Sequence, residues 1–318
     1  MRYRILIVGS GQLGSRYLQG LSKVSMPLEI IVSDVSPESL ARAELRWLET
    51  DGLKTSHRVK YVMGLSEVPF EVDVAIISTS ADVRASVISK LAEQVAVRYW
   101  VLEKVLAQSE AQLDLITSVL HETTKAWVNT PNRIMRWHNS FKKETPHRSP
   151  TIGSLKGCDW GLVCNAVHYL DFMEWWTGEA LAEIQTQQLA SHWHKSKRLG
   201  FWEVDGMLIA KFSGGSELSL HCSKSVAPYA LSLATKDYQW TIQELDGVAI
   251  RSDGLSIPGR MEFQSEMTAA LVESILATGT CNLPTLVESV ALHRPLLHAL
   301  LAHWNSTMPD QLSMVPIT

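Results

Sequence analysis

The sequence has few cysteines and no strong surplus of one charge. Its four cysteines include no C-x-x-C pair, which argues against a disulfide framework or a structural zinc site and favours free thiols. Lysine and arginine number 29 against 33 aspartate and glutamate residues, a net charge of -4 without a long basic tract. Nucleic acid is therefore not expected as the main partner.

Long hydrophobic stretches are missing as well. The longest apolar runs, such as residues 5–8 and 74–77, fall far short of the about 20 residues that a membrane-spanning helix needs. Residues 1–4 lead directly into a strand-like run, without the apolar core and cleavage site of a signal peptide. We therefore expect a cytoplasmic protein with no membrane partner.

The length and composition suit two folded domains. The chain has 318 residues, of which 46% are hydrophobic and 19% charged. In residues 1–130, β-rich runs alternate with helical stretches, which predicts an α/β domain with a doubly wound parallel sheet, a Rossmann fold. The expected strands are residues 3–8, 28–33, 59–63, 72–79, 100–103 and 126–129. Ser36 before Pro37 marks one helix start, and a capping box at Ser109 marks another.

Residues 131–318 follow a different pattern. A helical stretch at residues 161–176 precedes β-rich runs at 207–212, 217–222 and 238–245, with turns at 214–215 and 246–247. Because no helices separate these runs, they predict an α+β domain with an open antiparallel sheet. Two helical stretches, 265–278 and 286–303, close the chain.

A glycine-rich turn follows the first expected strand and opens a helix: Gly9, Ser10, Gly11, Gln12, Leu13 and Gly14. In this pattern the first glycine makes a tight turn, the second lets a pyrophosphate approach the backbone, and the third lets helix and strand pack closely. The phosphates then meet the N–H groups of the helix N-terminus. The turn therefore predicts a dinucleotide cofactor.

Asp34 ends the second expected strand, where a carboxylate would accept hydrogen bonds from the adenine ribose and repel a 2′-phosphate. We therefore predict NAD as the cofactor. Ser33 and Ser36 could tolerate a phosphate, which leaves NADP open.

Glu103 and Lys104 stand where the fifth strand ends, and the carboxyl ends of strands in such a sheet open onto the ligand crevice. Lys104 could hold a substrate oxygen or relay its proton while hydride leaves the same carbon. The alternative from position alone is an ordinary strand-end ion pair.

The helical stretch 161–176 carries a semi-polar stripe of Cys164, His168, Asp171 and Trp175. His168 could act as acid and base, because an imidazole titrates near working pH, and Asp171 could orient it. A purely structural His–Asp pair is the alternative. Arg133, after the sixth strand, could meet an anionic group of the substrate. His192 and His194 have no third ligand at a recognisable spacing, so we expect no metal site.

These motifs together resemble the Gfo/Idh/MocA oxidoreductase family, named for glucose–fructose oxidoreductase and inositol dehydrogenase. The resemblance covers nearly the whole chain and rests on residues 9–14, 72–79, 101–107, 168–171 and 283–289. It implies an NAD(P)-binding Rossmann domain at 1–130 and a substrate-binding domain at 131–318 whose open sheet often forms a dimer face. It also implies hydride transfer to or from a hydroxyl or keto carbon of a sugar, cyclitol or nucleotide-sugar-like substrate.

The resemblance makes Lys104 and His168 the catalytic residues. With the glycine-rich turn, the expected cofactor-binding residues are Asp34, Ser78, Thr79, Glu103 and Lys104. The expected substrate-binding residues are Lys104, Arg133, Cys164, Asn165, His168 and Asp171.

The sequence departs from the family pattern at two of these motifs. Cys164, with Asn165 beside it, stands where sugar-oxidising members usually carry an aspartate, and Val105 replaces the proline that follows the lysine. A thiol does not replace an orienting carboxylate without a lowered pKa. Two alternatives to a sugar dehydrogenase therefore stay open: a non-catalytic dinucleotide-binding sensor or regulator, and a reductase of a non-sugar, similar to biliverdin reductases.

Overall fold

The computed structural model describes residues 2–52, 56–121, 124–145, 150–225 and 228–318.

Near-continuous apolar runs form the strands of a six-stranded parallel sheet. The sheet has the order β3-β2-β1-β4-β5-β6. Its strands are β1 (Tyr3–Val8), β2 (Leu28–Asp34), β3 (Arg58–Met63), β4 (Glu71–Ile77), β5 (Ala96–Glu103) and β6 (Lys125–Asn129). All neighbours pair in parallel, which confirms the predicted doubly wound sheet.

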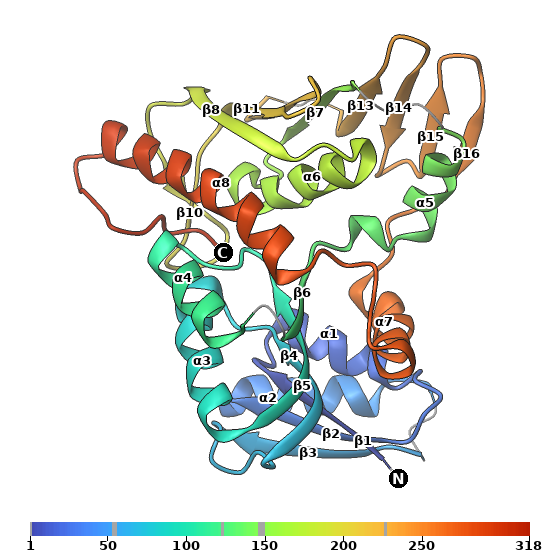
Figure 1. Cartoon of the computed structure of the whole chain (residues 1–318), viewed down its shortest axis with the longest axis vertical. Coiled ribbons are helices and arrows are strands. Elements are labelled where there is room, and N and C mark those ends of the chain that lie inside the picture. Colours follow the sequence, from blue (N-terminus) through green and yellow to red (C-terminus); the bar gives the residue numbers. More distant parts are fainter. Residues whose placement is uncertain (1, 53–55, 122–123, 146–149, 226–227) are drawn as a thin grey trace. The chain divides into compact units, whose positions relative to one another are not determined.

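Helices cover both faces of this sheet (Figure 1). Because βαβ connections are right-handed and the strand order reverses after β3, α1 and α2 cover one face and α3 and α4 the other. The helices are α1 (Gln12–Leu21), α2 (Pro37–Leu48), α3 (Ala81–Gln94) and α4 (Glu110–Val119). The predicted cap of α2 is confirmed, since the Ser36 side chain accepts a hydrogen bond from the Ser39 N–H and Pro37 takes the first helical position.

The chain divides into two compact units, and each is assembled from three segments rather than divided by a single boundary at residue 130. Unit 1 comprises Met1–Leu106, Ala111–Asn129 and Glu262–Val287, and unit 2 comprises Ala107–Glu110, Thr130–Met261 and Glu288–Thr318. Residues 262–287, which we expected in the second domain, thus belong to unit 1. The physical reason is packing: α7 (Gln264–Thr278) lies against α1, where a Cβ on Gly20 would come 2.6 Å from the Thr268 Cβ.

Unit 2 contains an eight-stranded sheet in the order β16-β15-β14-β13-β7-β12-β11-β8. Its strands are β7 (Ile152–Cys158), β8 (Leu181–Leu189), β11 (Gly206–Phe212), β12 (Glu217–Ser223), β13 (Ala230–Ala234), β14 (Gln239–Gln243), β15 (Val248–Arg251) and β16 (Ser256–Pro258). A short pair, β9 (His194–Lys195) and β10 (Trp202–Glu203), lies outside this sheet. The expected antiparallel arrangement needs one correction, because β7 and β12 pair in parallel and the sheet is mixed.

The helices of unit 2 are the 3-10 turn η2 (Pro131–Arg133), α5 (Arg136–Lys143), α6 (Leu162–Thr177) and α8 (Leu286–Thr307). Helix α6 packs against the sheet at β12, where Leu218, Leu220 and Cys222 are buried. The residues between them are half-buried, so the two faces of β12 differ. In the described part of the chain, no helix is long and apolar enough to cross a membrane.

Candidate functional site

The glycine-rich turn has the backbone geometry that a dinucleotide site needs. Gly9 has φ +89°, and a Cβ there would lie 2.9 Å from the Thr79 nitrogen. A Cβ on Gly14 would lie 1.8 Å from the Gly9 carbonyl oxygen, so no larger residue fits. At Gly11, by contrast, no described atom lies within 4 Å of the place a Cβ would take. The turn is therefore closed at Gly9 and Gly14, where neighbouring protein atoms leave no room for a side chain, and open at Gly11, where a Cβ would meet no described atom.

Asp34 lies beside this turn, at the carboxyl end of β2. Its Oδ2 accepts hydrogen bonds from the Ser10 backbone N–H at 2.5 Å and from the Ser10 hydroxyl at 3.1 Å. Its Oδ1 accepts one from the Ser36 N–H at 2.9 Å. The carboxylate is therefore fixed next to the turn and keeps further acceptor capacity, because each carboxylate oxygen has two lone pairs.

Ser78 and Thr79, at the end of β4, meet the turn from the other side. The Ser78 hydroxyl donates to the Gly9 carbonyl at 2.6 Å and lies 3.2 Å from the Val8 carbonyl. Ser78 thus holds the turn in place. The buried Thr79 hydroxyl has no hydrogen-bond partner among the described residues. An unpartnered hydroxyl and an open Gly11 are features that a bound dinucleotide would complete, so the residues present fit that group.

Gln12 and Leu13 form the first turn of α1, whose N–H groups suit an anion. Arg46, at the end of α2, reaches this turn: its guanidinium donates to the Ser15 hydroxyl at 2.5 Å and to the Gln12 side-chain oxygen at 3.3 Å. No spacing within one helix links Arg46 to Gln12 and Ser15, since Arg46 lies on α2 and the other two on α1.

Glu103 is a buried carboxyl rather than a solvated one. Its Oε1 accepts hydrogen bonds from the Tyr17 hydroxyl at 2.5 Å and the Asn129 amide at 2.7 Å. Burial raises the pKa of Glu103, while these hydrogen bonds and the positive charges of Arg84 and Lys104 lower it. The side chain is thus anchored inside unit 1, directly before Lys104.

Arg84 is a buried residue near Thr79 and Lys104 that no motif in the sequence marked. It is 1% exposed, and its guanidinium donates to the carbonyl oxygens of Thr79 and Val105. These two residues follow the ends of β4 and β5, so Arg84 ties together the strand ends on which Thr79 and Lys104 stand. The Lys104–Val105 peptide bond is cis.

In unit 2, α6 carries the predicted stripe of Cys164, His168 and Asp171. The Asn132 amide donates to the His168 carbonyl oxygen at 3.2 Å, which joins η2 to α6. Asp171 does not stand alone, because the Arg133 guanidinium donates to both of its oxygens, at 2.9 and 2.5 Å. Burial raises the pKa of Asp171 to about 6, against the opposing charge of Arg133. The structure thus joins Arg133 and Asp171 into one buried ion pair.

The first turn of α6 holds Cys164 and Asn165. The Asn165 amide donates to the Trp160 carbonyl at 2.8 Å. The carboxylate of Glu203, from β10, accepts hydrogen bonds from the N–H groups of Val163 and Cys164. No sequence pattern marks Glu203 as a partner of Cys164, because it lies 39 residues away on a two-residue strand.

The two predicted catalytic residues belong to different units: Lys104 to unit 1 and His168 to unit 2. His194 Nε2 lies 3.5 Å from Asp205, and within the described ranges no three His, Cys, Asp or Glu side chains are grouped as metal ligands.

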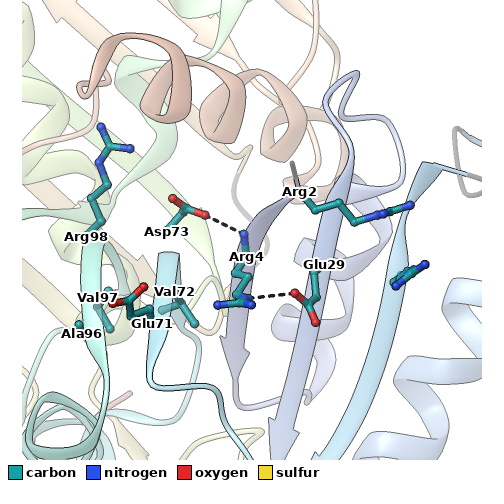
Figure 2. Close-up of a pocket in the computed structure, with 10 residues that line it drawn as sticks. Arg2, Arg4, Glu29, Glu71, Val72, Asp73, Ala96, Val97 and Arg98 are labelled. Carbon is teal, nitrogen blue, oxygen red and sulfur yellow. Dashed lines mark hydrogen bonds and ion pairs between the residues drawn. The ribbon is translucent and has the colours of Figure 1, made fainter.

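A hollow of about 690 Å³ lies at the amino ends of the strands of unit 1 (Figure 2). The glycine-rich turn follows the carboxyl end of β1, at the other end of these strands. The hollow is lined by Arg2, Arg4, Glu29, Arg58, Glu71, Val72, Asp73, Ala96, Val97 and Arg98. Arg4 pairs with Glu29 at 2.9 Å, and its backbone N–H donates to Asp73 at 2.8 Å. Ligands of doubly wound sheets bind at the carboxyl ends of the strands, and here the opposite charges partly neutralise one another. We therefore do not assign the hollow to the reaction.

Comparison with protein-family models found no match, and comparison with curated proteins found none either. Solved structures gave clear fold matches. The chain is similar to UDP-N-acetylglucosamine 3-dehydrogenase GnnA from Acidithiobacillus ferrooxidans, with 14% identity, a TM-score of 0.70, and 94% of this chain and 96% of that one covered. It is also similar to an oxidoreductase from Agrobacterium radiobacter in complex with NAD+, L-tartaric acid and magnesium (12% identity, TM-score 0.72, 96% and 97% covered).

A third similar structure is apo scyllo-inositol dehydrogenase from Lactobacillus casei, with 14% identity, a TM-score of 0.67 and 96% of each chain covered. The chain therefore shares the two-domain fold of these three structures, as the motifs predicted.

Proposed function

We propose that this protein is an NAD(P)-dependent oxidoreductase that acts on a hydroxyl or keto carbon of a sugar, cyclitol or nucleotide-sugar-like substrate. One observation carries the proposal: in a fold shared with dehydrogenases, the glycine-rich turn is closed at Gly14, open at Gly11 and flanked by Asp34. Two of the three similar proteins named above are, by name, dehydrogenases of a nucleotide sugar and of a cyclitol, which supports this substrate class.

The residues of unit 1 would hold the cofactor. The N–H groups of the turn and of the first turn of α1 would bind the pyrophosphate, Asp34 the adenine ribose, and Thr79 a further polar group. When bound, the nicotinamide supplies the hydride acceptor or donor. NAD is the favoured form because the Asp34 carboxylate would repel a 2′-phosphate.

Lys104 and His168 would act on the substrate oxygen. The Lys104 ammonium stabilises negative charge that develops on this oxygen, and His168 accepts or returns its proton. Cys164 and Asn165 are proposed substrate contacts on the first turn of α6. Arg133 and Asp171, the other expected substrate contacts, are hydrogen-bonded to each other, and this pair holds η2 against α6.

Two measurements test this function. Protein freed of copurified cofactor is titrated with NADH and separately with NADPH, followed by nicotinamide fluorescence, and NADH is expected to bind more tightly. Turnover is then measured on a panel of sugars, cyclitols and nucleotide sugars. Lys104→Ala and His168→Ala should lose turnover and keep NADH binding, whereas Lys60→Ala, at an exposed ion pair with Glu67, should keep both. Failure to bind either cofactor would overturn the proposal.

The Cys164 thiol on α6 favours a second candidate, a dinucleotide-binding sensor that has lost the chemistry. Tight NADH binding, no turnover on the panel and a protein partner captured only with cofactor would support it. Turnover of an imine or tetrapyrrole acceptor, with sugars inert, would instead support a reductase of a non-sugar substrate.

We further propose that the protein forms a homodimer through the face of the eight-stranded sheet opposite α6. Ile152 and Ile250 expose 56% and 40% of their surface, although isoleucine is usually buried. Sedimentation of the wild type and of Ser219→Arg, on the half-buried face of β12, tests this. A wild-type monomer would contradict it.

A further inference from the structure

The helix that carries His168 begins at a residue with no side chain. Gly161 is the N-cap of α6, with φ +74°, so it cannot itself accept hydrogen bonds from the first-turn N–H groups through a side chain. The first N–H groups of a helix have no acceptor within the helix and need one from elsewhere.

Glu203 supplies that acceptor from a distant part of the chain. Its Oε2 accepts a hydrogen bond from the Val163 N–H at 3.0 Å, and its Oε1 accepts one from the Cys164 N–H at 3.3 Å. Glu203 is only 8% exposed. A buried carboxylate held at the positive end of a helix dipole is stabilised in its charged form. The negative charge therefore stands at the first turn of α6.

Gly161 also lies close to both this carboxylate and the Asn165 amide. A Cβ on Gly161 would lie 3.2 Å from both the Asn165 Nδ2 and the Glu203 Oε1, so these two groups flank the same point. Cys164 and His168 are four residues apart on one face of the helix, and helical side chains lean toward the N-terminus. The His168 side chain therefore leans toward the turn that Glu203 holds.

We propose that Glu203 is a positioning residue of the substrate site. Its carboxylate fixes the first turn of α6, and its negative charge at this turn keeps Cys164 a neutral thiol. The substrate role rests on the function proposed above, whereas the effect on Cys164 does not. A helix N-terminus by itself favours a thiolate, and a carboxylate bound to the same N–H groups opposes it.

Other charged groups lie on the residues near Glu203 in the chain and on its paired strand, and they enter any pH dependence. His194 is its partner in the β9–β10 pairing, and Asp205 lies 3.5 Å from His194 Nε2 and 3.9 Å from the Lys224 Nζ. On β12, burial raises the pKa of the Cys222 thiol, and the charges of Asp205 and Glu203 raise it further. The charge of Glu203 thus raises the pKa of one thiol near this helix end.

The first test needs no enzyme activity. The rate at which iodoacetamide alkylates Cys164 is measured from about pH 6 to about pH 9 by peptide-resolved mass spectrometry, which separates Cys164 from the other cysteines. In Glu203→Gln the midpoint of the profile should move to lower pH, with alkylation near pH 7 faster by about threefold or more. Glu183→Gln, an exposed carboxylate on β8, is the matched control and should leave the profile unchanged.

Two results would overturn the proposal: an unchanged midpoint, or a rate increase that is uniform over the pH range, since the latter reports only a loosened helix. The second test uses turnover. Glu203→Gln should lower kcat by about tenfold with NADH binding retained, and Cys164→Asp in the same background should restore part of it by returning a carboxylate to the turn. Normal kcat in Glu203→Gln, or a loss without rescue, would reduce Glu203 to a structural cap. If the wild type turns over nothing, the proposed function fails, and the alkylation profile alone decides the role of Glu203.

Discussion

The guanidinium of Arg133 and the carboxylate of Asp171 form a two-pronged ion pair, with Nε to Oδ2 at 2.9 Å and Nη2 to Oδ1 at 2.5 Å. The Arg133 side chain is 11% exposed and the Asp171 side chain 3%. Paired hydrogen bonds of this kind fix the orientation of both groups. Because Arg133 follows β6 and Asp171 lies on α6, the pair sets how η2 lies against that helix. Glu288, at 3.7 Å from Arg133 Nη1, extends the network to α8.

Breaking this pair from one side should be more harmful than removing both partners. Arg133→Met leaves the Asp171 carboxylate buried without its countercharge, which should lower the free energy of unfolding by about 3–5 kcal/mol. The double variant Arg133→Met/Asp171→Leu removes the buried charge as well and should recover most of that loss. Urea unfolding at neutral pH measures both. Equal losses in the single and double variants would contradict this account.

The glycine-rich turn allows a matched pair of substitutions. Gly14→Ala would place a methyl group 1.8 Å from the Gly9 carbonyl oxygen and should destabilise unit 1 by about 3 kcal/mol. Gly11→Ala meets no described atom within 4 Å and should leave the thermal unfolding midpoint unchanged. If a pyrophosphate lies over Gly11, the same methyl group should weaken NADH binding by about tenfold or more, about 1.4 kcal/mol. Unchanged NADH binding in a folded Gly11→Ala protein would place the cofactor elsewhere.

Asp34 should decide the choice between the two cofactors. Asp34→Asn keeps a hydrogen-bond acceptor for the Ser10 N–H and removes the negative charge, so the ratio of NADPH to NADH affinity should rise by about tenfold. Asp73→Asn makes the same change of charge near the amino end of β4 and serves as the control. A ratio that changes equally in both variants would show a general effect of net charge.

The sequence predicted best those features that depend on neighbouring residues. The runs that became β1 and β2, the turn between β1 and α1, and the cap at Ser36 are local patterns, and the structure confirms them within a residue or so. Strand β7 was missed because its inward positions include Gly153 and Gly157, whose lack of a side chain weakens the alternating pattern.

The contacts that organise the candidate site could not be predicted in this way. Glu203 meets Cys164 across 39 residues, and Arg133 meets Asp171 across 38. Such contacts are set by how strands and helices pack, and no periodicity within one element encodes them. The sequence could therefore name His168 and Asp171 from their spacing on one helix, but not the partners that hold that helix.

Glu244 is a buried carboxyl whose ionisation should weaken the fold. It follows β14, and its Oε2 accepts a hydrogen bond from the Tyr169 hydroxyl at 3.1 Å, while Tyr169 is also hydrogen-bonded to Tyr229. Its Oε1 finds no partner in the described ranges of the chain. Burial raises the pKa of Glu244 from 4.5 to about 7, with the Tyr169 hydrogen bond opposing.

The direction of the pH effect follows from this raised pKa. Between pH 4.5 and about 7 the folded protein holds the Glu244 proton while the unfolded chain has released it. Raising the pH through this window therefore lowers the free energy of unfolding, by up to about 3 kcal/mol from this group, and the loss is complete above the folded pKa.

Glu244→Gln should remove this term, because the amide stays neutral and its oxygen can still accept the Tyr169 hydrogen bond. The variant should match the wild type in urea unfolding near pH 4.5 and exceed it by about 2–3 kcal/mol near pH 8. Other titrating groups are common to both proteins and cancel in this difference. Glu183→Gln, at an exposed residue of β8, should show no such pH-dependent gain. A difference between Glu244→Gln and wild type that is the same at both pH values would mean that folding does not raise the pKa of Glu244.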